Sequence, residues 1–160
     1  MSKVSGLKVL ITGGSSGIGK ATAKQLVKNG AVVCITGRDK NKLETVASEI
    51  NAIPIHLDVT KYNSIAIKTL DAFHSMKGMD VLINNAGIGE FSKLEDIKVA
   101  QFEKVFSTNV IGLTMLTQEV VKFFKTQQHG TIINIGSTAA NNGFPSGSVY
   151  CASKFALRGL

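Results

Sequence analysis

The sequence is poor in residues that cross-link or kink a chain: its 160 positions hold two cysteines, two prolines and no tryptophan. Cys34 lies inside an apolar run and Cys151 near the end, and neither has CxxC or metal-ligand spacing, which excludes a disulfide scaffold. Unpaired thiols of this kind are typical of a reducing compartment. His56, His74 and His129 lie far apart in the sequence, so we predict no metal site.

Long hydrophobic runs are also missing. The N-terminus, MSKVSGLKVLITGG, offers only the short apolar run 9–11 before glycines begin, so it holds neither the apolar core of a signal peptide nor a membrane span. We therefore predict a cytoplasmic protein without membrane contact. With 44% hydrophobic residues the chain is long enough to bury one core, and we expect a single domain over residues 1–160.

Basic residues outnumber acidic ones, giving a net charge of +7, but no basic run is present. The 18 lysines and arginines are scattered almost singly, as in KATAKQLVKNG. This pattern favours solvated helix faces over a nucleic-acid interface. The excess positive charge also suits a small anionic ligand.

Strongly apolar runs alternate with segments of helical periodicity along the whole chain. The runs are rich in β-branched residues, which is typical of parallel strands covered on both faces. The predicted strands are Lys8–Thr12, Val32–Thr36, Ile53–Leu57, Val81–Asn84 and Thr131–Ile135. This alternation predicts an α/β fold, a doubly wound parallel sheet. Right-handed crossovers and a glycine-rich turn after the first strand predict the strand order 3-2-1-4-5.

The C-terminal end of the sequence does not match a finished sheet. In this order the strand Thr131–Ile135 lies at an edge, where an apolar strand exposes unpaired backbone groups that proteins normally cover. The last helix, from about Ser148, stops after about three turns with no glycine cap in the usual place. We therefore expect a C-terminally incomplete portion of a longer protein.

The segment TGGSSGIG follows the first strand and opens a helix. Glycines there allow positive φ and a close approach of backbone N–H groups to a pyrophosphate, and the helix N-terminus adds partial positive charge. A plain tight turn is the alternative, but the position between strand and helix favours a dinucleotide site. The turn residues expected to bind the cofactor are Gly13, Ser15, Ser16, Gly17, Ile18 and Gly19.

The second strand ends without the acidic residue that would bind an unmodified ribose. Gly37 and Arg38 instead offer space and a cation, which suits a 2′-phosphate and favours NADP(H) over NAD(H). Asp39 is interpreted as the N-cap of the next helix, with a ribose-binding role as the alternative. Ser16 occupies a position of the glycine-rich turn where a second cation would have supported binding of the 2′-phosphate. The alternative role of Arg38 is that of an exposed turn residue.

Asp58, in HLDVT at the end of the third strand, has two roles open to it. It is placed to accept a hydrogen bond from an adenine amino group at the carboxyl edge of the sheet. Helix capping just before Thr60 is an equally physical role.

Tyr150 and Lys154 lie four residues apart in a helical segment and so project from one face. At about 4 Å and an effective dielectric near 20, a lysine cation favours a phenolate by about 4 kcal/mol at most. Such a tyrosine suits general acid/base catalysis, provided that a hydride carrier and a donor for the substrate oxygen lie beside it.

These motifs resemble, in order and spacing, those of the short-chain dehydrogenase/reductases, from about residue 4 to the last residue. The residues that carry the resemblance are Thr12, Gly13, Gly17 and Gly19 of the turn, the pair Asp58-Val59, NNAG at Asn84–Gly87, Asn109 in STNVIG, Ser137 in INIGSTAA, and Tyr150 and Lys154 in YCASK.

The resemblance implies a Rossmann fold and an NADP(H)-dependent carbonyl reductase or alcohol dehydrogenase. Tyr150 would exchange a proton with the substrate oxygen while hydride moves to or from the nicotinamide, and Ser137 would hydrogen-bond the same oxygen. Lys154 would favour the phenolate and hold the nicotinamide ribose, and Asn109 would anchor a proton-relaying water. On residue type alone, Ser137 is also explained as a loop hydroxyl and Asn109 as a satisfied polar residue.

The resemblance also implies that the NNAG segment lines the adenine-ribose side of the cofactor, with Thr12 bonded to it structurally. A turn that ends the fourth strand is the alternative role of Asn84 and Asn85. The further cofactor-binding residues implied are Arg38, Asp58, Val59, Asn85, Ala86, Gly87, Tyr150 and Lys154.

The helix after Asn109 carries more apolar surface than is needed for one stripe facing the sheet. The resemblance implies that such a surface packs against a partner subunit in a homodimer or homotetramer. A wide face packed into the core is the alternative. The resemblance implies a small carbonyl or alcohol as the substrate, without its identity, and the pocket is expected to be bordered by Phe91, Asn141, Asn142 and Phe144. A noncatalytic dinucleotide-binding or interaction module is the competing function.

Overall fold

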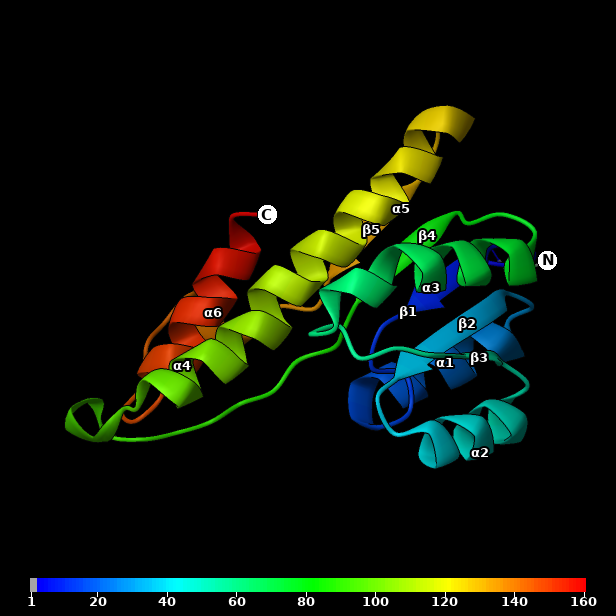
Figure 1. The fold of residues 1–160 in the computed structure, drawn as a ribbon. Coiled ribbons are helices and arrows are strands. Elements are labelled where there is room, and N and C mark those ends of the chain that lie inside the picture. Colours follow the sequence, from blue (N-terminus) through cyan, green and yellow to red (C-terminus); the bar gives the residue numbers. More distant parts are fainter. Residues whose placement is uncertain (1–2) are drawn as a thin grey trace.

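The computed structural model describes residues 3–160 and contains one parallel sheet of five strands in the order β3-β2-β1-β4-β5 (Figure 1). The strands are β1 (Lys8–Ile11), β2 (Val32–Gly37), β3 (Ile53–His56), β4 (Val81–Asn84) and β5 (Thr131–Asn134). The predicted doubly wound α/β fold and its strand order are therefore confirmed, and each strand boundary lies within one residue of its predicted place.

Helices cover both faces of this sheet (Figure 1). Helices α1 (Gly17–Lys28) and α2 (Lys40–Ile50) pack on one face, and α3 (Tyr62–Met76) and α5 (Leu113–Gln127) pack on the other. Alternate residues of β1 supply the two cores, since Val9 and Ile11 face the first pair of helices while Leu10 faces the second. None of the helices within residues 3–160 has the length and hydrophobicity needed to cross a bilayer.

The chain leaves β4 through a long segment with a short 3₁₀ turn, η1 (Leu94–Asp96), and returns along one long helical rod (Figure 1). The rod comprises α4 (Val99–Phe106), a π-helical segment η2 (Ser107–Gly112) and α5. A Cβ atom at Gly112 would lie 2.5 Å from the Val59 carbonyl oxygen, so a glycine is needed where the rod crosses the end of β3. A second 3₁₀ turn, η3 (Thr138–Ala140), and α6 (Ser148–Arg158) follow β5.

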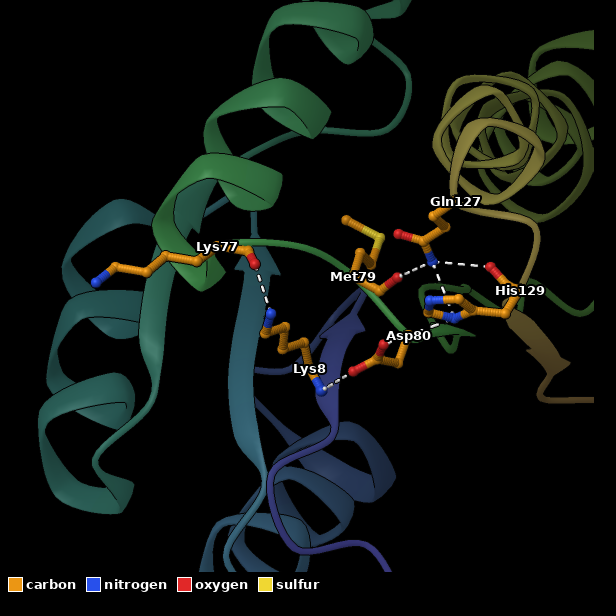
Figure 2. A network of polar contacts seen from close by, with 6 residues as sticks. All are labelled: Lys8, Lys77, Met79, Asp80, Gln127 and His129. Carbon is orange, nitrogen blue, oxygen red and sulfur yellow. Dashed lines mark hydrogen bonds and ion pairs between the residues drawn. The ribbon is translucent and has the colours of Figure 1, made fainter.

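A polar network joins the amino ends of the three neighbouring strands β1, β4 and β5 (Figure 2). The Lys8 backbone N–H donates to Asp80 Oδ2 at 2.8 Å, and His129 Nδ1 lies 3.8 Å from Asp80 Oδ1. Gln127 Nε2 donates to the Met79 carbonyl at 2.6 Å and to the His129 carbonyl at 2.8 Å. These contacts hold the amino ends of β1, β4 and β5 together. The carboxyl ends of the strands, on the opposite side of the sheet, are left for a ligand site.

The edge strand β5 has the exposure expected of an apolar edge. Ile132 and Ile133 are 38% and 42% exposed. Helix α6 ends at Arg158, and Gly159 at its C-cap keeps a right-handed backbone, so the helix has no left-handed glycine cap there, as the sequence predicted.

Candidate active site

The glycine-rich turn packs closely against the segment that follows β4. Gly13 and Gly17 have φ of 66° and 51°, in the left-handed region that favours glycine. A Cβ atom at Gly19 would lie 2.4 Å from Asn85 Nδ2, so only glycine fits there. At Gly17 the same Cβ would meet no atom within 4 Å, which leaves open space over the start of α1.

The N-terminus of α1 is built to face an anion. Its N-cap residue Ser16 makes no side-chain capping hydrogen bond, and its first turn contains no acidic residue. The N–H groups at this end are therefore available to a ligand, and the helix dipole adds partial positive charge.

Thr12 joins the turn to the NNAG segment. Its buried Oγ1 accepts hydrogen bonds from the backbone N–H groups of Asn85 and Ala86, at 3.0 and 2.9 Å. Asn85 Nδ2 donates in return to the carbonyls of Thr12 and Gly13, at 2.9 and 3.2 Å. The structural role expected of Thr12 is confirmed by these bonds.

Replacing Thr12 with valine is expected to lower the free energy of unfolding by about 2 kcal/mol or more, because two buried N–H donors lose their acceptor. Urea unfolding of Thr12→Val beside Thr12→Ser measures this. The serine variant keeps the hydroxyl and should stay close to the wild type. Equal stabilities of the two variants would show that the hydroxyl does not hold the NNAG segment.

A cavity of about 470 Å³ opens along the carboxyl ends of β1, β2, β3 and β4. It is lined by Gly13, Ser15, Ser16, Gly17, Ile18, Thr36, Gly37, Arg38, Leu57, Asp58, Val59, Asn85, Ala86, Gly87, Ile88 and Thr108. Among the residues expected to bind a cofactor, Gly19, Tyr150 and Lys154 do not line it. Gly19 is buried behind the turn.

Several of these lining residues were not predicted from the sequence, namely Thr36, Leu57, Ile88 and Thr108. The first three are direct neighbours of predicted motif residues, so extending each motif by one residue would have included them. Thr108 comes from the π-helical segment, for which the local pattern gave no signal.

At the end of β2, Gly37 lies against the turn. A Cβ atom there would come 2.9 Å from Ser15 Oγ, and the next residue, Arg38, is exposed at the mouth of the cavity. A ring nitrogen of His56, Nε2, lies 2.9 Å from the Arg38 carbonyl and anchors its backbone. Asp39 Oδ1 accepts from the Lys42 N–H at 3.0 Å, which confirms its interpretation as an N-cap.

Asp58 closes the turn that precedes α3. It accepts from the backbone N–H and the hydroxyl of Thr60, at 2.9 and 2.8 Å. Partial burial acts to raise the pKa of Asp58, but the hydrogen bonds from Thr60 and the charges of Arg38 and Lys61 together hold it below its usual value. The helix-capping alternative is wrong, because α3 begins at Tyr62 with Lys61 at its N-cap.

Helix α6 brings Tyr150 and Lys154 to the carboxyl ends of the strands. Lys154 is 6% exposed, and its Nζ donates to the Ile135 carbonyl at 2.8 Å. The same nitrogen lies 5.9 Å from the centre of the Tyr150 ring. Burial lowers the pKa of Lys154.

Asn109 joins the π-helical segment to Ile88, which lines the cavity, and to Ser153 of α6. Its Oδ1 accepts from the Ile88 N–H at 2.8 Å, and its Nδ2 donates to the Ile88 carbonyl at 2.9 Å and to Ser153 Oγ at 3.0 Å. Ser153 Oγ donates onward to the Tyr150 carbonyl at 2.7 Å. Asn109 is thus a satisfied buried polar residue that positions α6, and Ser153, directly before Lys154, is a partner that sequence reasoning missed.

Gly87 lies where the cavity meets this cluster. A Cβ atom at Gly87 would lie 3.3 Å from Asn109 Oδ1 and 3.8 Å from Lys154 Nζ. Because Gly87 also lines the cavity, it lies between the cavity and the side chains of Asn109 and Lys154.

Ser137 follows β5 as the N-cap of η3, a turn that packs on α6. Its Oγ accepts from the Ala139 N–H at 3.1 Å, a contact that uses an oxygen lone pair and leaves the hydroxyl proton for another acceptor. Arg158 at the end of α6 donates to Asn141 Oδ1 at 2.8 Å and holds the loop after η3 in place.

Comparisons with known proteins match this architecture. The family model for short chain dehydrogenases matches residues 7–160. An uncharacterised oxidoreductase of Staphylococcus haemolyticus is 34% identical over 163 residues, covering 98% of this chain and 69% of the relative. The NADP-dependent 3-hydroxy acid dehydrogenase of Schizosaccharomyces pombe is 35% identical over 165 residues, covering 98% of this chain and 64% of the relative.

A solved structure of a short chain dehydrogenase/reductase family protein superposes with a TM-score of 0.90 at 39% identity, covering 99% of this chain and 66% of that protein. The chain thus spans about two thirds of the length of the proteins that it matches. Because the family model matches residues 7–160 and the relatives cover almost the whole chain, the chain belongs to the short-chain dehydrogenase family of nicotinamide-dependent oxidoreductases.

Proposed function

We propose that the protein is an NADP(H)-dependent oxidoreductase that interconverts a carbonyl and an alcohol, with Tyr150 as the general acid/base. The observation that carries the proposal is the position of Gly87, which lines the cavity and also lies beside the side chains of Asn109 and Lys154. A buried lysine beside a tyrosine, at the end of a dinucleotide-sized groove, has the parts that such a reaction needs.

The residues of the cavity fit a dinucleotide. The open space over Gly17 and the uncapped N-terminus of α1 suit a pyrophosphate, and the segment Asn85–Gly87 supplies the wall along which the rest of the molecule would extend. When bound, the nicotinamide supplies or accepts the hydride.

The chain's own residues would manage the proton and the substrate oxygen. Tyr150 donates its phenolic proton to the carbonyl oxygen during reduction and takes it back during oxidation. Ser137 donates a hydrogen bond to the same oxygen and stabilises its developing charge. Lys154 stabilises the phenolate electrostatically, while Asn109 holds α6 in register and is the anchor we propose for a proton-relaying water.

The cofactor preference that we propose is NADP(H) over NAD(H). Gly37 has no side chain to reach a ribose hydroxyl, and the exposed Arg38 guanidinium beside it suits a 2′-phosphate. The dehydrogenase of S. pombe is named as NADP-dependent, which supports the same preference.

Removing the Arg38 side chain is expected to raise the Kd for NADPH by about 10- to 100-fold and to leave the Kd for NADH within about twofold, because only NADPH carries the 2′-phosphate. Titration of each cofactor, followed by its fluorescence, gives both constants for Arg38→Ala. Lys40→Ala is the matched control, since Lys40 is an exposed cation that pairs with Glu44 at 3.9 Å. A loss of the same size for both cofactors would refute the assignment of Arg38.

The assembly that we propose is a homo-oligomer of a single dinucleotide-binding unit spanning residues 1–160. Val99 and Phe102 of α4 and Phe155 of α6 are exposed apolar side chains that suit a subunit contact.

Turnover itself is tested by NADPH oxidation at 340 nm in the full-length protein against a panel of aldehydes and ketones. The proposal expects NADPH-dependent reduction of at least one carbonyl class. Tight NADPH binding without turnover of any carbonyl would indicate a noncatalytic binding module instead.

A further inference from the structure

Two exposed phenylalanines that have no part in the proposed mechanism lie near Tyr150: Phe91 contacts the tyrosine ring, and Phe144 contacts Phe91. Phe91 comes from the segment after β4 and is 59% exposed, and Phe144 comes from the loop before α6 and is 44% exposed. The centres of the Phe91 and Tyr150 rings lie 5.7 Å apart with their planes at 68°, an edge-to-face contact. The centres of Phe91 and Phe144 lie 5.9 Å apart at 48°, so the three rings form one continuous aromatic surface, here called the aromatic wall.

Both phenylalanine rings rest against glycines that make room for them. A Cβ atom at Gly89 would lie 3.0 Å from Phe91 Cζ. A Cβ atom at Gly147 would lie 2.4 Å from Phe144 Cε2, closer than real contacts allow. The backbone beside each ring is therefore shaped to seat it.

The two segments that carry the rings are also joined to each other. The Ser92 N–H donates to the Ser146 carbonyl at 3.0 Å, so Phe91 and Phe144 are held on a common frame. The charge next to Phe91 is engaged elsewhere, because Glu90 is ion-paired with Lys104 of α4. The rings of Phe91 and Phe144 are thus held in place and continue the apolar surface that begins at the ring of Tyr150.

We propose that the aromatic wall selects the substrate by binding a bulky apolar group, an aryl ring in the first place, attached to the reacting carbonyl carbon. This inference rests on the proposed function, because it takes the phenol of Tyr150 as the group that meets the carbonyl oxygen. A substituent on the same carbon then lies next to the rings of Phe91 and Phe144. Aromatic rings prefer tilted and edge-to-face partners at these separations, and contact with an apolar group removes all three surfaces from water. A carboxylate in the same place would lose its hydration without gaining a partner.

The experiment compares three aldehydes with different substituents, namely benzaldehyde, propanal and glyoxylate, by kcat/KM with NADPH in the full-length protein. The wild type is expected to favour benzaldehyde over each of the others by about tenfold or more. In Phe91→Ala and in Phe144→Ala the ratio of benzaldehyde to propanal is expected to fall by about tenfold. The matched control is Phe123→Ala, because Phe123 stacks on Phe73 between α3 and α5, at 4.4 Å, and lies outside the wall.

A binding measurement separates failure of this inference from failure of the proposed function. Saturation-transfer NMR with benzyl alcohol reports contact with the protein whether or not any aldehyde is turned over. We expect a signal in the wild type and in Phe123→Ala that is lost in the Phe91→Ala Phe144→Ala double variant.

Each outcome decides one point. Retained benzyl alcohol contact in the double variant, or an unchanged benzaldehyde to propanal ratio in both single variants, overturns the aromatic wall as the selecting surface. Loss of contact in the double variant, together with no turnover of any aldehyde by the wild type, supports the wall and refutes the proposed reaction.

Discussion

Replacing Tyr150 with phenylalanine is expected to lower kcat by about 10³-fold or more and to leave the Kd for NADPH within about threefold of the wild type. Phenylalanine keeps the ring and therefore its edge-to-face contact with Phe91. Only the hydroxyl is lost, and with it the proton that the substrate oxygen receives. Binding along the strand ends is preserved because the phenol does not line the cavity.

The matched control is Tyr62→Phe, since the chain has two tyrosines and Tyr62 lies at the start of α3. That variant should retain full turnover. Near-normal turnover in Tyr150→Phe would remove the phenol from the reaction, and a parallel loss of NADPH affinity would indicate a structural role instead.

Replacing Lys154 with methionine is expected to lower kcat by about 10²-fold or more and to weaken NADPH binding by about tenfold. Methionine fills much the same volume but removes the charge that stabilises the phenolate and the donor that reaches the Ile135 carbonyl. Steady-state kinetics and NADPH titration measure the two effects. Lys122→Met, which removes an exposed lysine paired with Glu119, is the control. If Lys154→Met lost no more than this control did, the cation would have no part in the reaction.

Because Lys154 titrates, the contribution of this residue to the free energy of unfolding depends on pH. Burial lowers the pKa of Lys154 from 10.5, so between the lowered value and 10.5 the unfolded chain holds a proton that the folded chain has released. Stability therefore rises with pH across that window, relative to Lys154→Met. Urea unfolding of both proteins between neutral pH and pH 10 should show the difference in free energy moving in favour of the wild type. A constant difference would mean that Lys154 is not desolvated.

The sheet was predictable because its strands carry a strong local signal. Runs such as Val81–Asn84, apolar on consecutive positions and bounded by polar residues, predict buried parallel strands, and the structure places them within one residue. Asp39 as an N-cap followed from the same kind of local evidence.

The π-helical segment Ser107–Gly112 was not predictable from its own residues, and the contacts that it makes lie elsewhere in the chain. Gly112 lies against the Val59 carbonyl, a contact between residues that are distant in sequence. π-Helical turns are frequent at functional sites, and this one carries Asn109 to its partners Ile88 and Ser153. Sequence spacing could name Asn109 as a candidate but could not supply those partners.

The same limit explains the alternative role of Asp58 that the structure corrects. Asp58 forms hydrogen bonds with Thr60 in a turn rather than capping a helix, because α3 begins later than the local pattern suggests. Helix ends depend on a few weak interactions and are less strongly encoded than the apolar face of a helix.

Hydride transfer at this site is tested most directly with NADPH that carries deuterium at both C4 positions, by following deuterium into the alcohol product with mass spectrometry. One deuterium is expected on the former carbonyl carbon with the full-length wild type, and no such product above background is expected with Tyr150→Phe. Unlabelled alcohol, or equal labelling by both proteins, would contradict the assignment of this site as a hydride-transfer centre with Tyr150 as its acid.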